Sequence, residues 1–445
     1  MDNIFDLNFI FYFRLIFIWA VVLIIFWLIL RIIWRQWKIS ARKKYREKQN
    51  YILLSVNVPR DNEQGPEAIE RFFAHLAGIK ISPSWWQKNI KGVEQLDVSL
   101  EIISQNGQIS FLIYTPVEYR DLVEASLYSI YPGVEIFESE DYTQLAPLEF
   151  PDEKYDLWGA DLGLYNKNPY PIRTYPSFEH SLSKELKDPM TGFLEILGKL
   201  HPEEQVWIQF IIEPSGSELK KQGEELIKKI TGEKTGESKS FLNKLIYFPI
   251  KFLETIVDII VLGLGFLIPS VSEGETKAEK TISFGDKKLA EAIQNKISKI
   301  AFATKIRLIY LAEKDVFSKE RGITGIISSF NTVNTLDLNG LSPEKKVFSS
   351  AKHPYKTAGS KEAILEAYRR RACYWETKPK GLKRIIKKTA DFLTINIKKY
   401  QKKNILNIEE LATLYHFPVM GSGRAPLIKK TGSKKGEPPF FLPVK

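Results

Sequence analysis

A single apolar run near the N-terminus constrains this chain more than any other feature. The run extends from Phe9 to Leu30 and contains one charged residue, Arg14. An α-helix needs about 20 apolar residues to cross the hydrocarbon core of a bilayer, so this run is long enough to span it once. The sequence therefore predicts a transmembrane anchor over residues 1–34.

The charges that flank the run predict its orientation. Asp2 and Asp6 precede it, and a dense basic group follows it: Arg31, Arg35, Lys38, Arg42, Lys43, Lys44, Arg46 and Lys48. Lys and Arg next to a membrane helix favour the cytoplasmic side. We therefore predict a single-pass protein of the inner or plasma membrane, with its N-terminus outside, a basic juxtamembrane linker over residues 35–50 and the bulk of the chain in the cytoplasm.

A cleaved signal peptide is the alternative to a retained anchor. Such a peptide has its basic residues before the apolar run and small residues at a cleavage site after it, and this sequence has Arg and Trp after the run instead. The tryptophans near the end of the run also fit the aromatic belt of a membrane interface: they are Trp27, Trp34 and Trp37.

Composition predicts folded domains behind the anchor. Hydrophobic residues make up 44% and aromatic residues 12% of the chain, and its length leaves room for two or three domains at about 100–200 residues each. The formal net charge is +11, with a second basic run over residues 378–403. Cys373 is the only cysteine, which excludes an intramolecular disulfide and a cysteine-rich zinc site.

Residues 51–145 have the pattern of one small α+β domain. Alternating apolar residues predict strands over 51–58, 96–104, 108–114 and 134–138, and helical spacing predicts helices over 67–76 and 118–130. Asn106-Gly107 between the second and third strands is a strong hairpin signal. The order βαββαβ is that of a ferredoxin-like domain.

Residues 150–375 repeat this arrangement. Strands are predicted over 155–164, 170–175, 205–213 and 304–313, and helices over 191–200, 218–230, 287–301, 316–329 and 363–372. The fold class is therefore α+β, with an N-terminal transmembrane helix followed by two ferredoxin-like βαββαβ-type domains.

An apolar insertion over residues 241–268 interrupts the second domain. Its uncharged core, residues 259–268, is about half the length of a membrane span, so we favour a pair of interfacial or re-entrant helices on the same membrane face. A second crossing and a buried hydrophobic lid are the alternatives. A crossing would carry the lysine-rich C-terminal part outside, against the bias of basic residues toward the cytoplasm.

Motifs of catalysis are not found in the sequence. There is no Gly-x4-Gly-Lys-Ser/Thr loop to cradle phosphate, no zinc spacing among the scattered histidines and no Gly-x-Ser-x-Gly elbow. We therefore assign no catalytic, cofactor-binding or metal-binding residue, and predict that the protein is not an enzyme. Isolated carboxylates within the strands, such as Glu101, Asp156 and Asp161, are expected at the surface.

The most specific text lies near the C-terminus. Residues 376–445 are predicted to form a basic helical segment and a Pro-rich tail. Within them, residues 404–418 read NILNIEELATLYHFP and predict a short helix capped by Asn407. This segment resembles the one ahead of the motor domain in prokaryotic conjugation-type ATPases, the coupling-protein and HerA-like relatives of type IV secretion systems. Asp188-Pro189-Met190 and the strand ending in Pro214 resemble upstream parts of the same proteins. An ordinary helix with Leu411, Leu414 and Tyr415 packed inward is the alternative for residues 404–418.

The resemblance implies a function in secretion or conjugation. In full-length relatives a Walker A domain follows the Pro-rich segment, whereas this sequence ends at Lys445, so the resemblance implies a scaffold that positions an ATPase carried by another chain. The expected partners are membrane lipid, that ATPase and a second copy of this chain. The expected ATPase contact is the Pro-rich tail together with Asn407, Glu409, Glu410, Leu411, Leu414, His416 and Pro418.

Binding of nucleic acid or anionic lipid by basic residues is the alternative function. Clustered Lys and Arg attract the phosphate backbone and anionic headgroups. The candidates on this hypothesis are Arg369, Arg370, Arg371, Lys383, Arg384, Lys387 and Lys388, with DNA as the partner. A solvated helix face is the structural alternative for the same residues.

Overall fold

The computed structural model describes residues 2–59, 61–178, 188–232, 283–344, 354–372 and 404–419. The predicted insertion over 241–268 lies outside these residues, as do the basic run over 378–403 and the Pro-rich tail.

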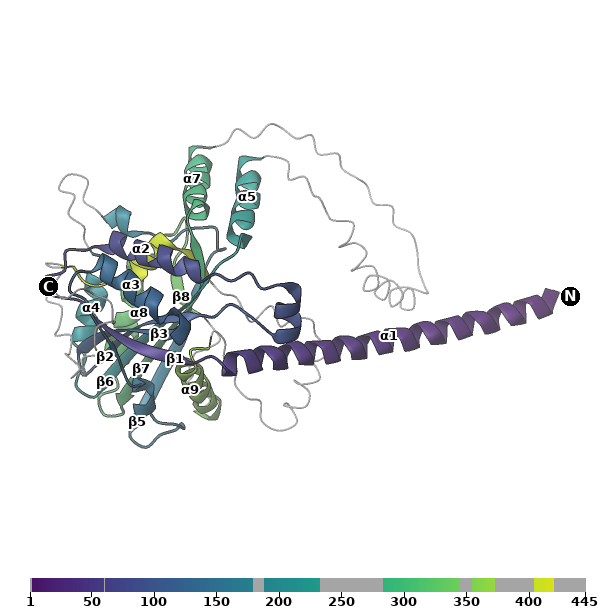
Figure 1. Cartoon of the computed structure of the whole chain (residues 1–445), viewed down its shortest axis with the longest axis horizontal. Coiled ribbons are helices and arrows are strands. Elements are labelled where there is room, and N and C mark those ends of the chain that lie inside the picture. Colours follow the sequence, from purple (N-terminus) through teal and green to yellow (C-terminus); the bar gives the residue numbers. More distant parts are fainter. Residues whose placement is uncertain are drawn as a thin grey trace.

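The N-terminal helix α1 runs without interruption from Asp2 to Glu47. At 1.5 Å per residue its 46 residues are about 70 Å long, and Figure 1 shows it standing away from the rest of the protein. Large apolar side chains along it are exposed, among them Trp19 and Leu23. The part from Phe17 to Glu47 is, among the described residues, the one helix long and apolar enough to cross a membrane. The basic residues predicted as a linker continue this helix as far as Glu47, because Lys and Arg are good helix formers.

Within the described residues, all strands belong to one nine-stranded antiparallel sheet. Its order is β4-β1-β3-β2-β6-β7-β5-β8, and β9 pairs with the start of β7. The strands are β1 Tyr51–Asn57, β2 Val98–Gln105, β3 Gln108–Pro116, β4 Glu135–Glu138, β5 Tyr155–Leu164, β6 Glu204–Pro214, β7 Ala301–Glu313, β8 Leu341–Pro343 and β9 Asn404–Asn407.

The two predicted domains meet edge to edge in this sheet, where β2 pairs with β6 from Val98 opposite Ile212 to Gln105 opposite Gln205. Outward from this junction each half presents its second, third, first and fourth strand in turn. Buried apolar residues of both halves belong to one continuous core. The two halves therefore share both a sheet and a hydrophobic interior.

Helices cover one face of the sheet (Figure 1). They are α2 Pro66–Leu76, α3 Arg120–Ile130, α4 Thr191–Gly198, α8 Ile326–Phe330 and α11 Ile408–Leu414. Phe73 of α2 contacts Phe302 of β7 edge-on, and Ser104 of β2 donates a hydrogen bond of 2.8 Å to the Leu197 carbonyl of α4. Side chains alternate along a strand, so Phe302 and Ser104 point away from the face that carries Arg307 and Glu101.

Helix α9, Pro354–Arg369, lies on the opposite face. Its Ile364 packs so closely on β5 that a Cβ built at Gly159 would lie 2.9 Å from the Ile364 Cδ1 atom. Glycine at position 159 therefore allows the helix to approach the strand.

Two further helices, α5 Glu218–Thr231 and α7 Phe284–Ser298, follow β6 and precede β7. They pack against each other through a small separate cluster that includes Leu219 and Ile297. Figure 1 shows them side by side, standing off the sheet at a steep angle to α1. The predicted insertion over 241–268 falls between them in the sequence, outside the described residues.

Short turns complete the fold. They are the 3₁₀ turns η1 Ala77–Ile79, η3 Val117–Tyr119, η4 Tyr142–Leu145, η5 Tyr175–Phe178 and η7 Asn331–Val333, and the π-helical turns η2 Gln87–Lys91 and η6 Glu320–Gly325. The predicted hairpin is confirmed, since Asn106 and Gly107 both have positive φ between β2 and β3. The helix predicted over 316–329 is instead η6 followed by α8.

The strand predicted over 170–175 is wrong. Two of its backbone amides bond to side chains of the C-terminal segment instead of to a strand: Ile172 donates to Glu410 over 2.9 Å, and Tyr175 to the Thr413 hydroxyl over 2.9 Å. A segment more than two hundred residues away therefore satisfies this stretch, which local alternation cannot reveal.

Candidate functional site: a buried ionic network beneath the end of α9

A row of polar side chains crosses the centre of the sheet. The register places Glu101 of β2 opposite Gln209 of β6, Gln209 opposite Arg307 of β7, and Arg307 opposite Asp161 of β5. Directly opposed residues point to the same face. All these side chains are buried, at 3% exposure or less. Burying a charge away from water costs free energy unless the charge is paired and hydrogen-bonded. The partners of these four side chains therefore determine whether the row stabilises the fold.

The C-terminal end of α9 supplies those partners. The Arg371 amide donates to the Tyr368 carbonyl, and the Ala372 amide to the Ala367 carbonyl, each over 2.9 Å. These bonds form a Schellman motif that ends the helix, and Arg371 occupies its left-handed position with φ of 48°. Glycine is preferred at such a position because a Cβ atom is strained there. An arginine in this conformation indicates that its side chain has a role that offsets the strain.

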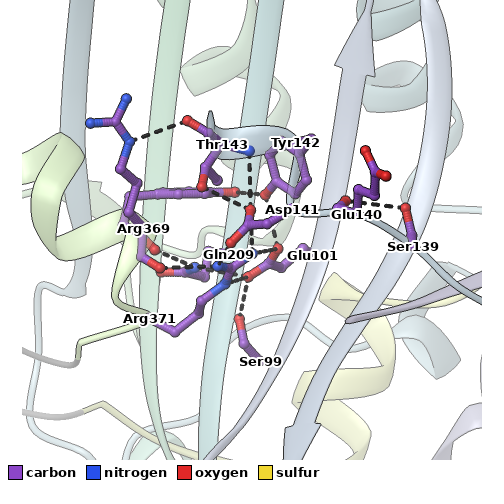
Figure 2. A network of polar contacts seen from close by, with 11 residues as sticks. Ser99, Glu101, Ser139, Glu140, Asp141, Tyr142, Thr143, Gln209, Arg369 and Arg371 are labelled. Carbon is purple, nitrogen blue, oxygen red and sulfur yellow. Dashed lines mark hydrogen bonds and ion pairs between the residues drawn. The ribbon is translucent and has the colours of Figure 1, made fainter. Parts of the chain in front are cut away.

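The Arg371 guanidinium bridges two carboxylates (Figure 2). It contacts Glu101 through Nε at 3.1 Å and Nη2 at 3.3 Å, and it pairs with both oxygens of Asp141, which precedes η4. Its carbon Cζ also lies 4.3 Å from the centre of the Tyr114 ring. Burial lowers the pKa of Arg371, but the attraction of Glu101 and the hydrogen bond to Asp141 outweigh it and the pKa is raised. The arginine is therefore held as a cation.

Neutral donors complete the environment of Glu101. Its carboxylate accepts hydrogen bonds from Ser99 Oγ at 2.8 Å, Tyr142 Oη at 2.8 Å and Gln209 Nε2 at 2.9 Å. Burial, followed by the nearby Glu101 charge, raises the pKa of Tyr142 well above its ordinary value, so this hydroxyl remains a donor. The Tyr142 and Tyr368 hydroxyls lie 2.8 Å apart. Side chains from β2, β6, η4 and the turn that follows α9 thus meet at one carboxylate.

The other end of the polar row holds a second ion cluster. Asp161 pairs with Arg307 at 2.8 Å and with Lys305 at 2.8 Å, and Lys305 reaches Glu344 at 3.5 Å. Arg307 also donates to the Ala372 carbonyl over 3.0 Å, so this cluster too touches the end of α9. Burial alone would raise the pKa of Asp161, but Arg307 and Lys305 hold it below its ordinary value.

Stability is expected to fall in acid because of these carboxyl groups. The pKa of Asp141 is also lowered, because its bonds to Arg371 outweigh the opposing effect of burial. A carboxyl whose folded-state pKa lies below the unfolded value of about 3.9 stabilises the fold above that pH, and the stabilisation is lost as pH falls through the lowered value. The urea midpoint of the wild-type protein should therefore drop below about pH 4. Asp161→Asn should lower the midpoint at neutral pH and flatten the drop; an unchanged acid slope in this variant would contradict the assignment.

Chemically, the network is suited to holding segments together. It ties together η4, two central strands, the last turn of α9 and the residues up to Ala372 that follow it. Among the described residues no group of three or more His, Cys, Asp or Glu side chains could hold a metal ion.

The residues predicted to contact a partner ATPase are mostly internal, which corrects the prediction for them. Asn407, Glu410, Leu411, Leu414 and His416 are each at most 5% exposed, and Glu409 and Pro418 are half-buried. The predicted cap is confirmed: the Asn407 side chain accepts from the Glu410 amide at 2.8 Å, and Glu410 accepts in return from the Asn407 amide at 2.9 Å. The inward packing of Leu411, Leu414 and Tyr415, stated as the alternative, is what the structure contains.

Two buried polar contacts lock this C-terminal segment into the body. Glu410 lies 3.0 Å from the Lys296 ammonium of α7, with both side chains fully buried. His416 lies 2.8 Å from the Asp188 carboxylate through Nε2 and 2.7 Å from the Ala412 carbonyl through Nδ1. The C-terminal segment over residues 404–417 is thus part of the core, with its charged side chains paired inside.

Of the residues predicted to bind nucleic acid or lipid, some are buried or held by other groups, one is exposed and the rest lie outside the described residues. Arg371 is 4% exposed and occupied by Glu101 and Asp141, so it cannot reach a phosphate, and Arg369 donates to the Thr143, Ala146 and Pro147 carbonyls. Arg370 is exposed and pairs with Glu366 one helical turn away. Lys383, Arg384, Lys387 and Lys388 lie outside the described residues.

The sequence prediction missed the network because it placed its carboxylates at the surface. Glu101 and Asp161 are buried, and only Asp156 is partly exposed, where it pairs with Lys361. A signal was present: Glu101 and Asp161 on the one hand, and Lys305 and Arg307 on the other, are charges of opposite sign within largely apolar strands. A strand covered on both faces has no solvent side for such a charge, so opposite charges in neighbouring strands pair.

These features define an α+β protein built on one large antiparallel sheet, with an N-terminal helix that could cross a membrane. By sequence the chain belongs to the family described as a domain of unknown function, DUF8128, which matches residues 41–345. The match includes the last part of α1 and both halves of the sheet up to β8. No curated protein matches the chain.

Proposed function

We propose that this protein is a non-enzymatic scaffold anchored in the cell membrane by α1, with its body in the cytoplasm, where it positions the ATPase of a secretion- or conjugation-type machine. The observation that supports an anchored scaffold is that the exposed apolar helix α1 continues into a folded body whose buried ion pairs hold its segments together. The ATPase as partner is proposed from the resemblance of residues 404–418. The basic residues after the apolar run give the orientation.

The two halves of the body are, on this proposal, two ferredoxin-like units fused through their second strands. What supports this is the repeated strand order β4-β1-β3-β2 and β8-β5-β7-β6, with α2 and α3 in the first half and α4 and α8 in the second following equivalent strands. A continuous sheet of this kind is a rigid platform for a partner.

We place the ATPase contact on the Pro-rich tail beyond Val419, because most of the residues between 407 and 418 that were first predicted to contact the ATPase are internal. The test is capture of the ATPase by the tagged full chain, solubilised in mild detergent from its own cells. A protein with a Walker A loop should be retained. A variant that ends after Val419 should stay in the membrane fraction and lose that partner.

The control for this capture is Arg370→Met, which changes an exposed charge near the site without touching the tail. It should retain the ATPase as well as the wild-type chain does. Retention of no Walker A protein by the wild-type chain, or equal retention by the shortened one, would refute the scaffold role proposed for the tail.

A further inference from the structure

The loop between α2 and β2 runs along α1 toward the apolar part of that helix. Arg46 of α1 pairs with Glu94 and, at 3.7 Å, with Asp97. Further along the helix, Trp34 stacks on Trp85 with ring centres 6.2 Å apart. Trp34 and Arg46 are twelve positions apart, which corresponds to about 18 Å of helix, so the loop follows α1 over that distance. Figure 1 shows the loop in dark blue beside the base of α1.

Backbone packing holds the loop against the helix between these points. Gly92 has φ of 73°, and a Cβ atom built there would lie 2.3 Å from the Ala41 backbone carbon. A side chain at this position would therefore both strain the loop and clash with α1. The loop is thus seated on the helix, and its tip has a fixed height along it.

The tip of the loop carries two large exposed aromatic side chains. Trp85 is 60% and Trp86 67% exposed, and the two rings meet edge-on with centres 5.5 Å apart. Exposed lysines flank them at positions 80, 88 and 91. Two adjacent exposed tryptophans on a surface in water are unfavourable in free energy, because each leaves a large apolar area in contact with water. Their exposure needs a partner.

The height of the tip identifies that partner. Trp34 lies four residues beyond Leu30, the end of the apolar run, which is about 6 Å of helix. The headgroup layer of a bilayer extends roughly 5–7 Å beyond the hydrocarbon core, so a ring stacked on Trp34 lies within this layer. Tryptophan is enriched at that depth, and lysines beside it attract anionic headgroups.

We propose that the Trp85-Trp86 tip is a second membrane contact, inserted into the headgroup layer beside α1. The inference rests on the proposed function only in requiring that α1 spans the bilayer. Two contacts at one height, α1 and the tip, would fix the tilt of the body relative to the membrane plane, which a lone helix does not.

The test uses spin labels on the full chain in nanodiscs of phosphatidylcholine and phosphatidylglycerol. In a Cys373→Ser background, one cysteine is introduced at a time: Trp86→Cys at the tip, Trp27→Cys within the anchor, or Lys199→Cys as the solvent control. The Lys199 side chain is 80% exposed and follows α4, whose end lies beside the Asn106-Gly107 turn at the far end of β2 from α1. Collision rates with oxygen and with a water-soluble nickel chelate report depth.

We expect the label at position 86 to favour oxygen over nickel several-fold more than the label at 199, and less than the label at 27. A Ser84→Cys label should behave like that at 86, and should become nickel-accessible when Trp85→Ser and Trp86→Ser are added. A label at 86 that matches 199 while 27 stays shielded would overturn the tip contact and leave the anchor intact. Nickel access at 27 would overturn both.

Discussion

Arg371→Met is expected to lower the free energy of unfolding of the body by about 3–5 kcal/mol, the usual cost of removing one partner from a buried ion pair. The change leaves Glu101 without its cation at full burial and removes both bonds to Asp141. Urea unfolding of the full chain in detergent, followed by tryptophan fluorescence, measures the loss. Amide hydrogen exchange in residues 361–372 should rise, because the last turn of α9 loses its attachment.

Two variants separate the ion pair from the backbone strain at the same position. Arg371→Gly relieves the left-handed conformation but still removes the charge, so it should also destabilise the protein. Adding Glu101→Gln to Arg371→Met should recover part of the loss, since the neutral amide no longer needs a cation. Arg370→Met, one residue away and exposed, is the matched control and should have little effect. Wild-type stability in Arg371→Gly would show that the network does not hold α9.

Much of the fold was predictable because its signals are local. The apolar run of α1, the Asn106-Gly107 hairpin and the cap of α11 at Asn407 each depend on residues close in sequence, and each occurs where predicted. The joining of the halves through β2 and β6 was not predictable in this way. The sequence of β2 or β6 does not indicate which strand pairs with its edge, because both strands are apolar and would be apolar with any other buried neighbour.

The site was less predictable because its chemistry arises from distant pairs. Glu101 and Arg371 are 270 residues apart in sequence, and no spacing rule connects them. The same is true of Glu410 and Lys296, whose pairing turned a predicted contact surface into the interior. A charged residue is on average exposed to solvent. It can instead be buried where the fold brings a residue of opposite charge next to it.

Removal of either partner of the Lys296–Glu410 pair is the second change with a large expected effect. The two groups lie 3.0 Å apart and are fully buried, and Lys296 also donates to the Tyr170 carbonyl at 3.2 Å. Lys296→Met leaves the fully buried Glu410 carboxyl with only its two backbone amide donors and no cation, for which a loss of about 3–5 kcal/mol is expected. Limited proteolysis should then cut near residues 404–419, since the pair fastens this segment to α7.

A double variant shows whether the pair itself carries this effect. Glu410→Gln keeps an acceptor for the capping box while it removes the charge, so Lys296→Met with Glu410→Gln should lose less than the sum of the single changes. Lys299→Met is the control, because Lys299 pairs with Glu409 at the rim, where the two side chains are 36% and 17% exposed. Its loss should stay below about 1 kcal/mol. Additive losses in the double variant, or equal proteolysis in the Lys299 control, would mean that apolar packing around Leu411 and Tyr415, not the ion pair, holds the C-terminal segment in the core.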